Sequence, residues 1–281
     1  MQGVPESFDD PLDRAEFSRP AHRAGIELYR AHIVRYAFDP HTHEAFGLGA
    51  IESGVERFRY RGSDHLAPPE SLVLMNPDEL HTGRAETDGG WRYRMLYLDP
   101  AVLEDVTGER GWWFAQPVRH DPRVAALVSG HLAALWQAPD ALSVDGLLHD
   151  LLALLRAHAR TPSAARPTLG EPADPRLRRS LQSMREAPAE RFTLEALARE
   201  ADLSPFHFLR RFKAAFGVTP HQMLMALRLY RAKEWLAAGI APAEVAAGLG
   251  LVDQAHLTRR FARMYGVTPA RYQRQVGARA A

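Results

Sequence analysis

The 281-residue sequence contains no cysteine. This absence excludes disulfide bonds, zinc sites built on thiolates and cysteine nucleophiles. No run of apolar residues approaches the roughly 20 that a membrane-spanning helix needs. The first residues, MQGVPESFDDPLDRAEF, are acidic and contain no apolar segment, so we expect no secretory signal. These absences fit a protein of the cytoplasm that does not enter a membrane.

Charge is divided unevenly along the chain, although the formal net charge is only +1. From Asp174 onward, 18 Lys and Arg stand against 9 Asp and Glu, whereas residues 1–173 carry 17 against 25. A basic half joined to an acidic half indicates that only the basic half meets a polyanion such as nucleic acid. Arginines on solvated helix faces would give the same count, so the charge alone does not decide.

A proline-rich stretch divides the chain. Residues 161–175, TPSAARPTLGEPADP, carry four prolines and few large apolar side chains, which is typical of an interdomain linker. We therefore expect one domain at 1–160, a linker at 161–173 and a second domain at 174–281.

The first domain has the pattern of β-structure followed by helices. Short aromatic and branched runs between 26 and 99 are separated by turn signals, which predicts a sandwich or barrel. Helices are expected at about 121–137 and 143–160, the second with Ser143 as its N-cap. Leucines make the apolar stripe of that helix wide. The surplus can pair with a second subunit or belong entirely to the core.

A 14-residue segment recurs in the second domain with an offset of 49 residues. HFLRRFKAAFGVTP at 207–220 matches HLTRRFARMYGVTP at 256–269. The same offset, continued upstream, aligns Ala198 with Ala247 and Leu203 with Val252. A repeat of this length predicts a duplicated supersecondary unit.

Each copy has the pattern of a helix-turn-helix unit. In the first, a short apolar-striped helix precedes a turn near Asp202, and Ser204 caps a second helix that stops at Gly217. In the second, Asp253 is the cap and Gly266 the stop. Small residues would let the paired helices of each unit cross closely: Ala198, Ala201, Ala247 and Gly250.

Helical spacing gives the second helix of each copy a buried and an exposed face. The expected core residues are Phe208, Phe212 and Ala215 in one copy and Leu257, Phe261 and Met264 in the other. The exposed face of the first copy carries Phe206, Leu209, Arg210 and Lys213, and that of the second carries Thr258 and Arg259. Arginine on such a face can pair bidentately with guanine in the major groove. Arg211 and Arg260 lie off this face, where they can contact phosphates or form salt bridges.

A single long helix is expected between the copies, from about 220 to 238. It would act as a rigid spacer that places the two recognition helices about 34 Å apart, one turn of DNA. The predicted target is therefore a bipartite site read by one polypeptide.

These residues make the region from about 174 to 275 similar to the AraC/XylS family of bacterial transcription regulators. The matching segments are LSP at 203–205, LRLYRA at 227–232 and GVTP at the end of each repeat. The resemblance implies that the second helix of each unit enters the major groove. It offers as base-contacting residues Phe206, Leu209 and Arg210, then Gln254, His256, Thr258 and Arg259. Leu209 stands where the family often has a polar residue, so the first unit would read fewer hydrogen bonds.

The N-terminal half resembles the cupin-like sensor domain of the same family over about 25–100. The supporting segments are DPHTHE at 39–44, NPDELHTG at 76–83 and WRYRMLYLD at 91–99. The resemblance implies an α+β multidomain architecture: an N-terminal cupin-like β-barrel with C-terminal α-helices, then an all-α domain of two helix-turn-helix units joined by a long helix. It also implies dimerisation helices after the barrel, and RNA polymerase as a partner.

Three histidines stand where a cupin motif would place them. His41 and His43 lie two apart, so on a strand they point the same way, and His81 follows a strand and a turn. Three imidazoles can hold a divalent zinc, iron or nickel ion. Catalytic cupins also supply a carboxylate four or five residues after the second histidine, where this sequence has Gly47 and Leu48. A bound metal, the polar lining of a metal-free ligand pocket and ordinary surface histidines all remain open.

Arg94 lies in a strand where polar and aromatic residues alternate. If it faces the barrel interior, it can hold the carboxylate of a ligand; a salt bridge at the rim is the alternative. With the three histidines it completes the set of candidate ligand-binding residues.

The sequence therefore predicts a DNA-binding transcription regulator, without enzymatic activity, that responds to a small molecule bound in the N-terminal barrel. Ligand binding would favour one arrangement of the two domains over another. The alternative is a metal-dependent cupin enzyme or metal sensor fused to a DNA-binding module. The expected partners are double-stranded DNA, a small-molecule effector and a second copy of the chain.

Overall fold

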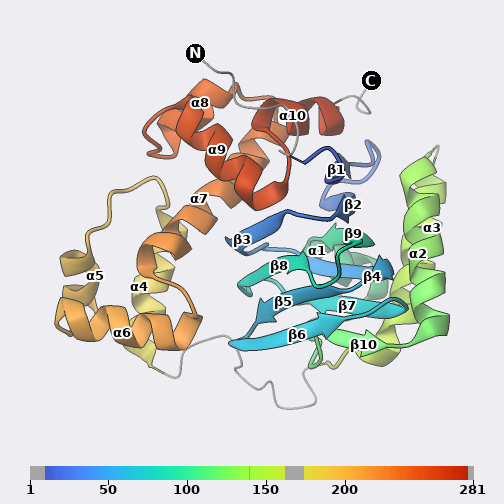
Figure 1. The fold of residues 1–281 in the computed structure, drawn as a ribbon, viewed down its shortest axis with the longest axis horizontal. Helices are drawn as coiled ribbons and strands as arrows, with labels where there is room; N and C mark the ends of the chain where they lie inside the picture. Colours follow the sequence, from blue (N-terminus) through green and yellow to red (C-terminus); the bar gives the residue numbers. More distant parts are fainter. Residues whose placement is uncertain (1–9, 139, 162–173, 278–281) are drawn as a thin grey trace.

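The N-terminal part consists of two antiparallel β-sheets packed face to face (Figure 1). The computed structural model describes residues 10–138, 140–161 and 174–277. One sheet has the strand order β1-β2-β9-β4-β7-β10 and the other β3-β8-β5-β6. The strands are β1 (Arg14–Ser18), β2 (Ile26–Ile33), β3 (Ala37–His41), β4 (Phe46–Gly54), β5 (Glu56–Tyr60), β6 (Ser63–Ala67), β7 (Ser71–Met75), β8 (His81–Ala85), β9 (Trp91–Leu98) and β10 (Val118–His120).

Alternation along each strand explains the layers. On β9, Trp91, Tyr93 and Met95 face the space between the sheets, whereas Leu96 and Leu98 belong to a second core on the outer face. The expectation of a β-rich N-terminal domain is confirmed. Strands β1 and β10 lie outside residues 26–99, on which the prediction of β-structure was based.

Helices cover that outer face of the six-stranded sheet. They are α1 (Pro100–Thr107), α2 (Pro122–Gln137) and α3 (Ala141–Leu155), followed by the short 3-10 helix η1 (Arg156–His158). Helix α2 packs on β4, β7 and β9, and α3 packs on α2. The prediction of Ser143 as N-cap is wrong. Helix α3 begins at Ala141, and Asp140 caps it by accepting from the Ser143 N–H at 2.8 Å, so Ser143 lies within the first turn.

The C-terminal part is entirely helical, as expected. Its elements are α4 (Pro175–Glu186), α5 (Leu194–Glu200), α6 (Pro205–Phe216), α7 (Pro220–Ala237), α8 (Pro242–Gly248), α9 (Gln254–Tyr265) and α10 (Pro269–Gly277). Helices α5 and α6 form the first helix-turn-helix unit, α8 and α9 the second, and α7 joins them. No helix of the described residues is long and apolar enough to cross a membrane. The expected linker at 161–173 lies outside those residues apart from its first position.

The turn of the second unit is one residue longer than that of the first. The N-caps of α5 and α8, Thr193 and Ala241, are 48 residues apart, whereas those of α6 and α9, Ser204 and Asp253, are 49 apart. The expected pairing of Ala198 with Ala247 is therefore wrong by one residue. Ala247, Gly250 and Val252 are exposed, and the buried positions equivalent to Ala198, Ala201 and Leu203 are Ala246, Leu249 and Leu251.

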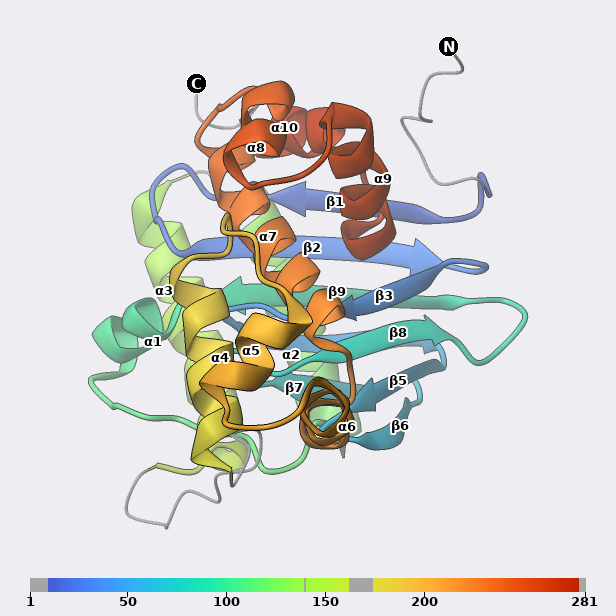
Figure 2. The same cartoon turned by 90° about the vertical axis from the view of Figure 1, so that its left-hand side faces the viewer.

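The second unit shares one continuous apolar core with the β-barrel, whereas the first unit has a separate core. Helix α9 packs on β3 and α10 packs on β1 (Figure 2). This explains why Ala215, expected in the core, is exposed. Its counterpart in the second unit, Met264, is covered by the barrel, and nothing in the described chain covers Ala215 in the same way.

Candidate DNA interface and effector pocket

Helix α6 presents a polar and aromatic face to solvent. Ser204 accepts from the His207 N–H to cap the helix, and Gly217, at φ 75°, ends it. Phe206 is 70% exposed, Arg210 and Lys213 are exposed and Leu209 is half-buried. The opposite face buries Phe208 and Phe212 completely, as expected.

Helix α9 has the same construction. Asp253 accepts from the His256 N–H at 2.6 Å to cap the helix. Gln254 and Arg259 are exposed, and Thr258 and His256 are half-buried. The Thr258 hydroxyl donates to the Gln254 carbonyl at 2.8 Å, and the Arg260 Nε donates to His256 Nε2 at 3.4 Å.

The two arginines at matching positions, Arg210 and Arg259, form no hydrogen bond or ion pair with any described residue. Their neighbours are engaged instead. Arg211 pairs with Asp174 at 3.2 Å, and Arg260 contacts His256. The free guanidinium groups have the exposure that reading a base edge requires.

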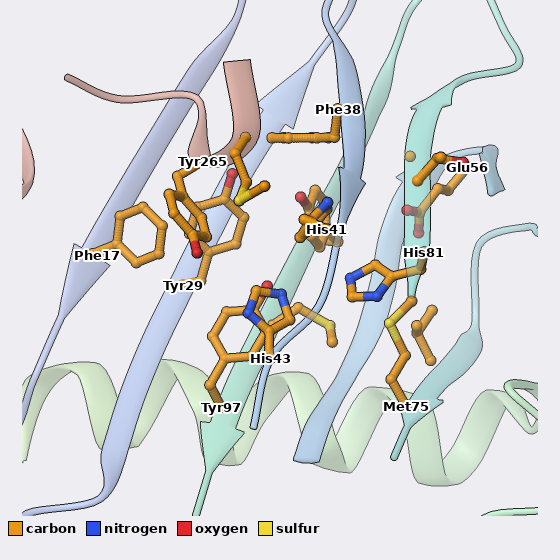
Figure 3. Close-up of a pocket in the computed structure, with 16 residues that line it drawn as sticks. Phe17, Tyr29, Phe38, His41, His43, Glu56, Met75, His81, Tyr97 and Tyr265 are labelled. Carbon is orange, nitrogen blue, oxygen red and sulfur yellow. The ribbon is translucent and has the colours of Figure 1, made fainter. Parts of the chain in front are cut away.

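Three buried histidines meet between the sheets (Figure 3). His41 ends β3 and lies opposite His81, the first residue of β8, and His43 follows two residues after His41. Their ring centroids are 4.2 Å (His41–His81), 5.1 Å (His41–His43) and 5.2 Å (His43–His81) apart. Each offers a ring nitrogen within 4.8 Å of the others. The reading of these residues as surface histidines is therefore wrong.

The histidine rings are held in defined orientations and are neutral. His41 Nδ1 lies 2.8 Å from the Asp39 carbonyl and His81 Nδ1 lies 3.0 Å from the Glu79 carbonyl, so each Nδ1 carries the proton. Burial lowers the pKa of His81 to about 4. Burial, with the neighbouring imidazoles, holds the pKa of His41 and His43 well below the usual value. His43 Nε2 is buried without a hydrogen-bond partner among the described residues.

These histidines line a small pocket that also includes residues of the second helix-turn-helix unit. Aromatic and sulfur-containing side chains form most of its wall, Glu56 lies at one end, and α9 contributes Met264 and Tyr265 (Figure 3). The enclosed space is about 30 Å³, room for one or two water molecules. Burial raises the pKa of Glu56 to about 8.

Arg94 is not part of this pocket. Its Nε donates to Glu52 Oε1 at 2.6 Å, and the Ser129 hydroxyl of α2 donates to the same oxygen. Because Tyr93 and Met95 face inward, Arg94 between them faces outward. The structure thus brings together the three predicted histidines and leaves the fourth predicted ligand residue in a salt bridge.

Sequence reasoning missed a buried ion pair between the two parts of the chain. Lys233 of α7 pairs with Glu27 of β2, and both side chains are at most 6% exposed. Tyr272 donates to Glu27 at 2.5 Å and Arg19 pairs with it at 2.9 Å. Burial alone would raise the pKa of Glu27, but these cations, Lys233 above all, lower it overall. The ammonium lies 4.6 Å from the Phe17 ring centroid, so a cation–π contact adds to the pairing.

A second, much larger cleft of about 1500 Å³ separates the barrel from the first unit. Tyr60, Arg61 and Trp113 line one side, and Lys213 and Phe216 line the other. Lys213, predicted to face DNA, is thus exposed at the edge of this cleft.

Comparison with known proteins shows the family to which the chain belongs. Residues 23–152 match the model of the AraC-like ligand binding domain, and residues 197–275 match a helix-turn-helix domain model. The HTH-type transcriptional regulator YbfI of Bacillus subtilis is 28% identical over 239 residues, which cover 83% of this chain and 86% of that protein. This chain belongs to the AraC family of transcription regulators.

Other relatives agree with this AraC-type assignment. The HTH-type transcriptional activator RhaS of Salmonella paratyphi A is 22% identical over 264 residues, covering 89% of this chain and 92% of that protein. Among solved structures, ToxT from Vibrio cholerae with bound unsaturated fatty acid aligns over 99% of this chain and all of that chain, with a TM-score of 0.54 and 10% identity. At that identity the likeness concerns the fold alone.

Proposed function

We propose that this AraC-type regulator reads a bipartite DNA site with α6 and α9, and that its effector acts at the histidine pocket. The observation that carries the proposal is that Met264 and Tyr265 belong both to α9 and to the wall of that pocket. A change in the pocket therefore reaches a recognition helix without an intermediate element.

The size of the pocket supports a mechanical coupling. With about 30 Å³ enclosed, an organic effector enters only if side chains move, and Met264 and Tyr265 form the wall that belongs to the other domain. Beside the pocket, the Tyr36 hydroxyl donates to the Ala262 carbonyl at 2.8 Å and Arg263 lies 3.6 Å from Asp39. An effector that displaces this wall would release α9 from β3, and the docked and released states would differ in DNA affinity. The fatty acid of the ToxT structure is an example of an effector too large for this pocket as it stands.

The residues proposed to contact bases are Phe206, Leu209, Arg210 and Lys213 of α6 and Gln254, His256, Thr258 and Arg259 of α9. The proposed sensor domain extends to residue 160 and the DNA-binding domain begins at 174. The protein would act in the cytoplasm, together with the chromosome it reads and the RNA polymerase it regulates.

A homodimer through α2 and α3 is part of the same proposal. These helices lie on the side of the barrel opposite to the first helix-turn-helix unit, α5 and α6 (Figure 1). Leu142 is 83% exposed and Leu127 is 41% exposed there, which leaves apolar surface for a second subunit. Light scattering of the wild type and of Leu142→Lys over a range of concentrations tests this assembly.

The rival function, a metal-dependent cupin enzyme, has less support. No carboxylate joins the three histidines among the described residues. Glu44 is exposed and Glu52 pairs with Arg94. A three-histidine site without a carboxylate differs from the facial triad of iron oxygenases.

Selection of genomic DNA fragments by the purified full chain tests the DNA-reading proposal. We expect the wild type to select a bipartite motif, Arg210→Ala to relax one half of it and Arg259→Ala the other. Each loss should amount to about 1–3 kcal/mol of discrimination at one base pair. Arg92→Ala, an exposed arginine of the barrel, is the matched control and should leave the motif unchanged. Relaxation of the same half by both variants would contradict the assignment of one half-site to each unit.

A further inference from the structure

The three histidines have the arrangement of metal ligands rather than of core residues. Backbone carbonyls of Asp39 and Glu79 accept from Nδ1 of His41 and His81, which leaves the lone pair of each Nε2 free. Metal-ligating histidines are oriented in this way by a carbonyl or carboxylate on the other ring nitrogen. His43 contributes a third nitrogen, Nε2, that is buried and has no partner among the described residues.

The distances and the space around them fit a single ion. Nitrogen ligands at about 2.0–2.1 Å from a tetrahedral zinc lie about 3.3 Å from one another. The histidine nitrogens lie within 4.8 Å of one another, so the three rings must approach one another to close the site on an ion. The enclosed 30 Å³ admits an ion with one water, whereas an organic molecule requires the wall to move.

We propose that His41, His43 and His81 bind a divalent transition-metal ion of the zinc class, with water at the remaining position. Imidazole nitrogens suit zinc, copper, nickel and iron, and a three-histidine set without carboxylate points to zinc or its spectroscopic substitute cobalt. The proposed metal site depends only on the positions of these three histidines, so it does not depend on whether the chain binds DNA. Its regulatory consequence rests on the proposed function above.

Tyr265 of α9 connects the proposed metal site to the DNA-binding part. Its hydroxyl is buried without a partner among the described residues, and its ring centroid lies 6.3 Å from those of both His41 and His43. A water bound to the ion can hydrogen-bond to this hydroxyl, which would tie α9 to the barrel. The ion thus stabilises the docked state that a bulkier effector would disrupt.

Metal binding is tested on the full chain after removal of metal with a chelator. We expect one Zn²⁺ per chain by calorimetry and elemental analysis, and the absorption of tetrahedral Co²⁺ when cobalt is added instead. His43→Ala and His81→Gln, the second of which keeps a side chain of similar size, should each weaken zinc binding at least tenfold. Circular dichroism identifies the variants that are folded. His32→Ala, a half-buried histidine on β2 whose ring nitrogen contacts the Gly89 carbonyl, is the matched control. Absence of stoichiometric zinc in the wild type, or equal loss in the His32→Ala control, overturns the site.

The regulatory part is tested by DNA affinity with and without saturating zinc. We expect zinc to change the affinity of the wild type for its selected DNA at least fivefold, a typical allosteric effect, and to change that of Tyr265→Phe much less. Zinc bound without any effect on DNA affinity overturns the regulatory link but keeps the site. A chain that binds zinc but selects no DNA instead overturns the proposed function, so the two failures are distinguishable.

Discussion

Glu56 is a buried carboxylic acid in the wall of the histidine pocket. It lies on β5, and its Oε1 is 3.0 Å from the position that a Cβ on Gly83 would occupy, so glycine makes room for it. Burial raises its pKa from 4.5 to about 8. The carboxyl is therefore protonated in the folded protein at neutral pH and can donate a hydrogen bond to an effector.

This shift makes stability depend on pH. Between about 4.5 and 8 the folded state holds a proton that the unfolded state has lost, so the free energy of unfolding falls as the pH rises, by about 1 kcal/mol per pH unit. Glu56→Gln keeps the shape and removes the titration. We expect the variant to gain stability relative to wild type as the pH rises from 5 to 8 in urea unfolding experiments, and the difference to level off above 8. The exposed Asp88→Asn is the control. A difference independent of pH would show that Glu56 is ionised in the folded protein.

At the scale of single residues, the sequence predicted the histidine cluster but not the buried pair of Lys233 and Glu27. The spacing of His41 and His43 and the position of His81 predicted their convergence, because strand geometry fixes side-chain direction. The burial of Lys233 could not be predicted, because a lysine in an amphipathic helix is normally exposed. The carboxylate that compensates its burial, Glu27, lies more than 200 residues away in the sequence.

At the scale of elements, local chemistry determined most helix ends. Ser204, Asp253, Gly217 and Gly266 cap α6 and α9 as the sequence predicted, since capping depends on residues within one turn. The extra residue in the second turn was not predictable from the offset of the repeat. Asp202 takes the left-handed conformation (φ 51°) in the first turn, whereas Gly250 (φ 66°) does so in the second.

The cap of α9 offers a prediction for this element. Asp253→Ala removes the acceptor of the His256 N–H and should cost about 1 kcal/mol in unfolding free energy, with faster amide exchange in the first turn of α9. Asp253→Asn removes the same charge but keeps an acceptor oxygen, so it should stay close to wild type. If both variants lose the same stability, the charge rather than the hydrogen bond supports the helix.

For the whole molecule, the sequence predicted two parts but not their joint core. The composition of 161–175 and the change from β to helical pattern define the parts. The apolar residues that join them include Met264, Tyr272 and Val276. Their sequence does not indicate which surface they pack against, because burial against any apolar surface is favourable. One signal was present: the second unit has Met264 where the first has Ala215, and among the described residues it is the second unit whose core is continuous with that of the barrel.

The central claim is that the barrel and the second recognition helix form one switch, and a distance measurement tests it most directly. Because the chain has no cysteine, spin labels can be placed at Arg92→Cys on β9 and Ala270→Cys on α10, both exposed. The account predicts that binding of the selected bipartite DNA changes the distribution of label distances, since coupling between the two sites is reciprocal. An identical distribution with and without bound DNA would contradict it, and would mean that the sensor and the recognition helix move independently of each other's state.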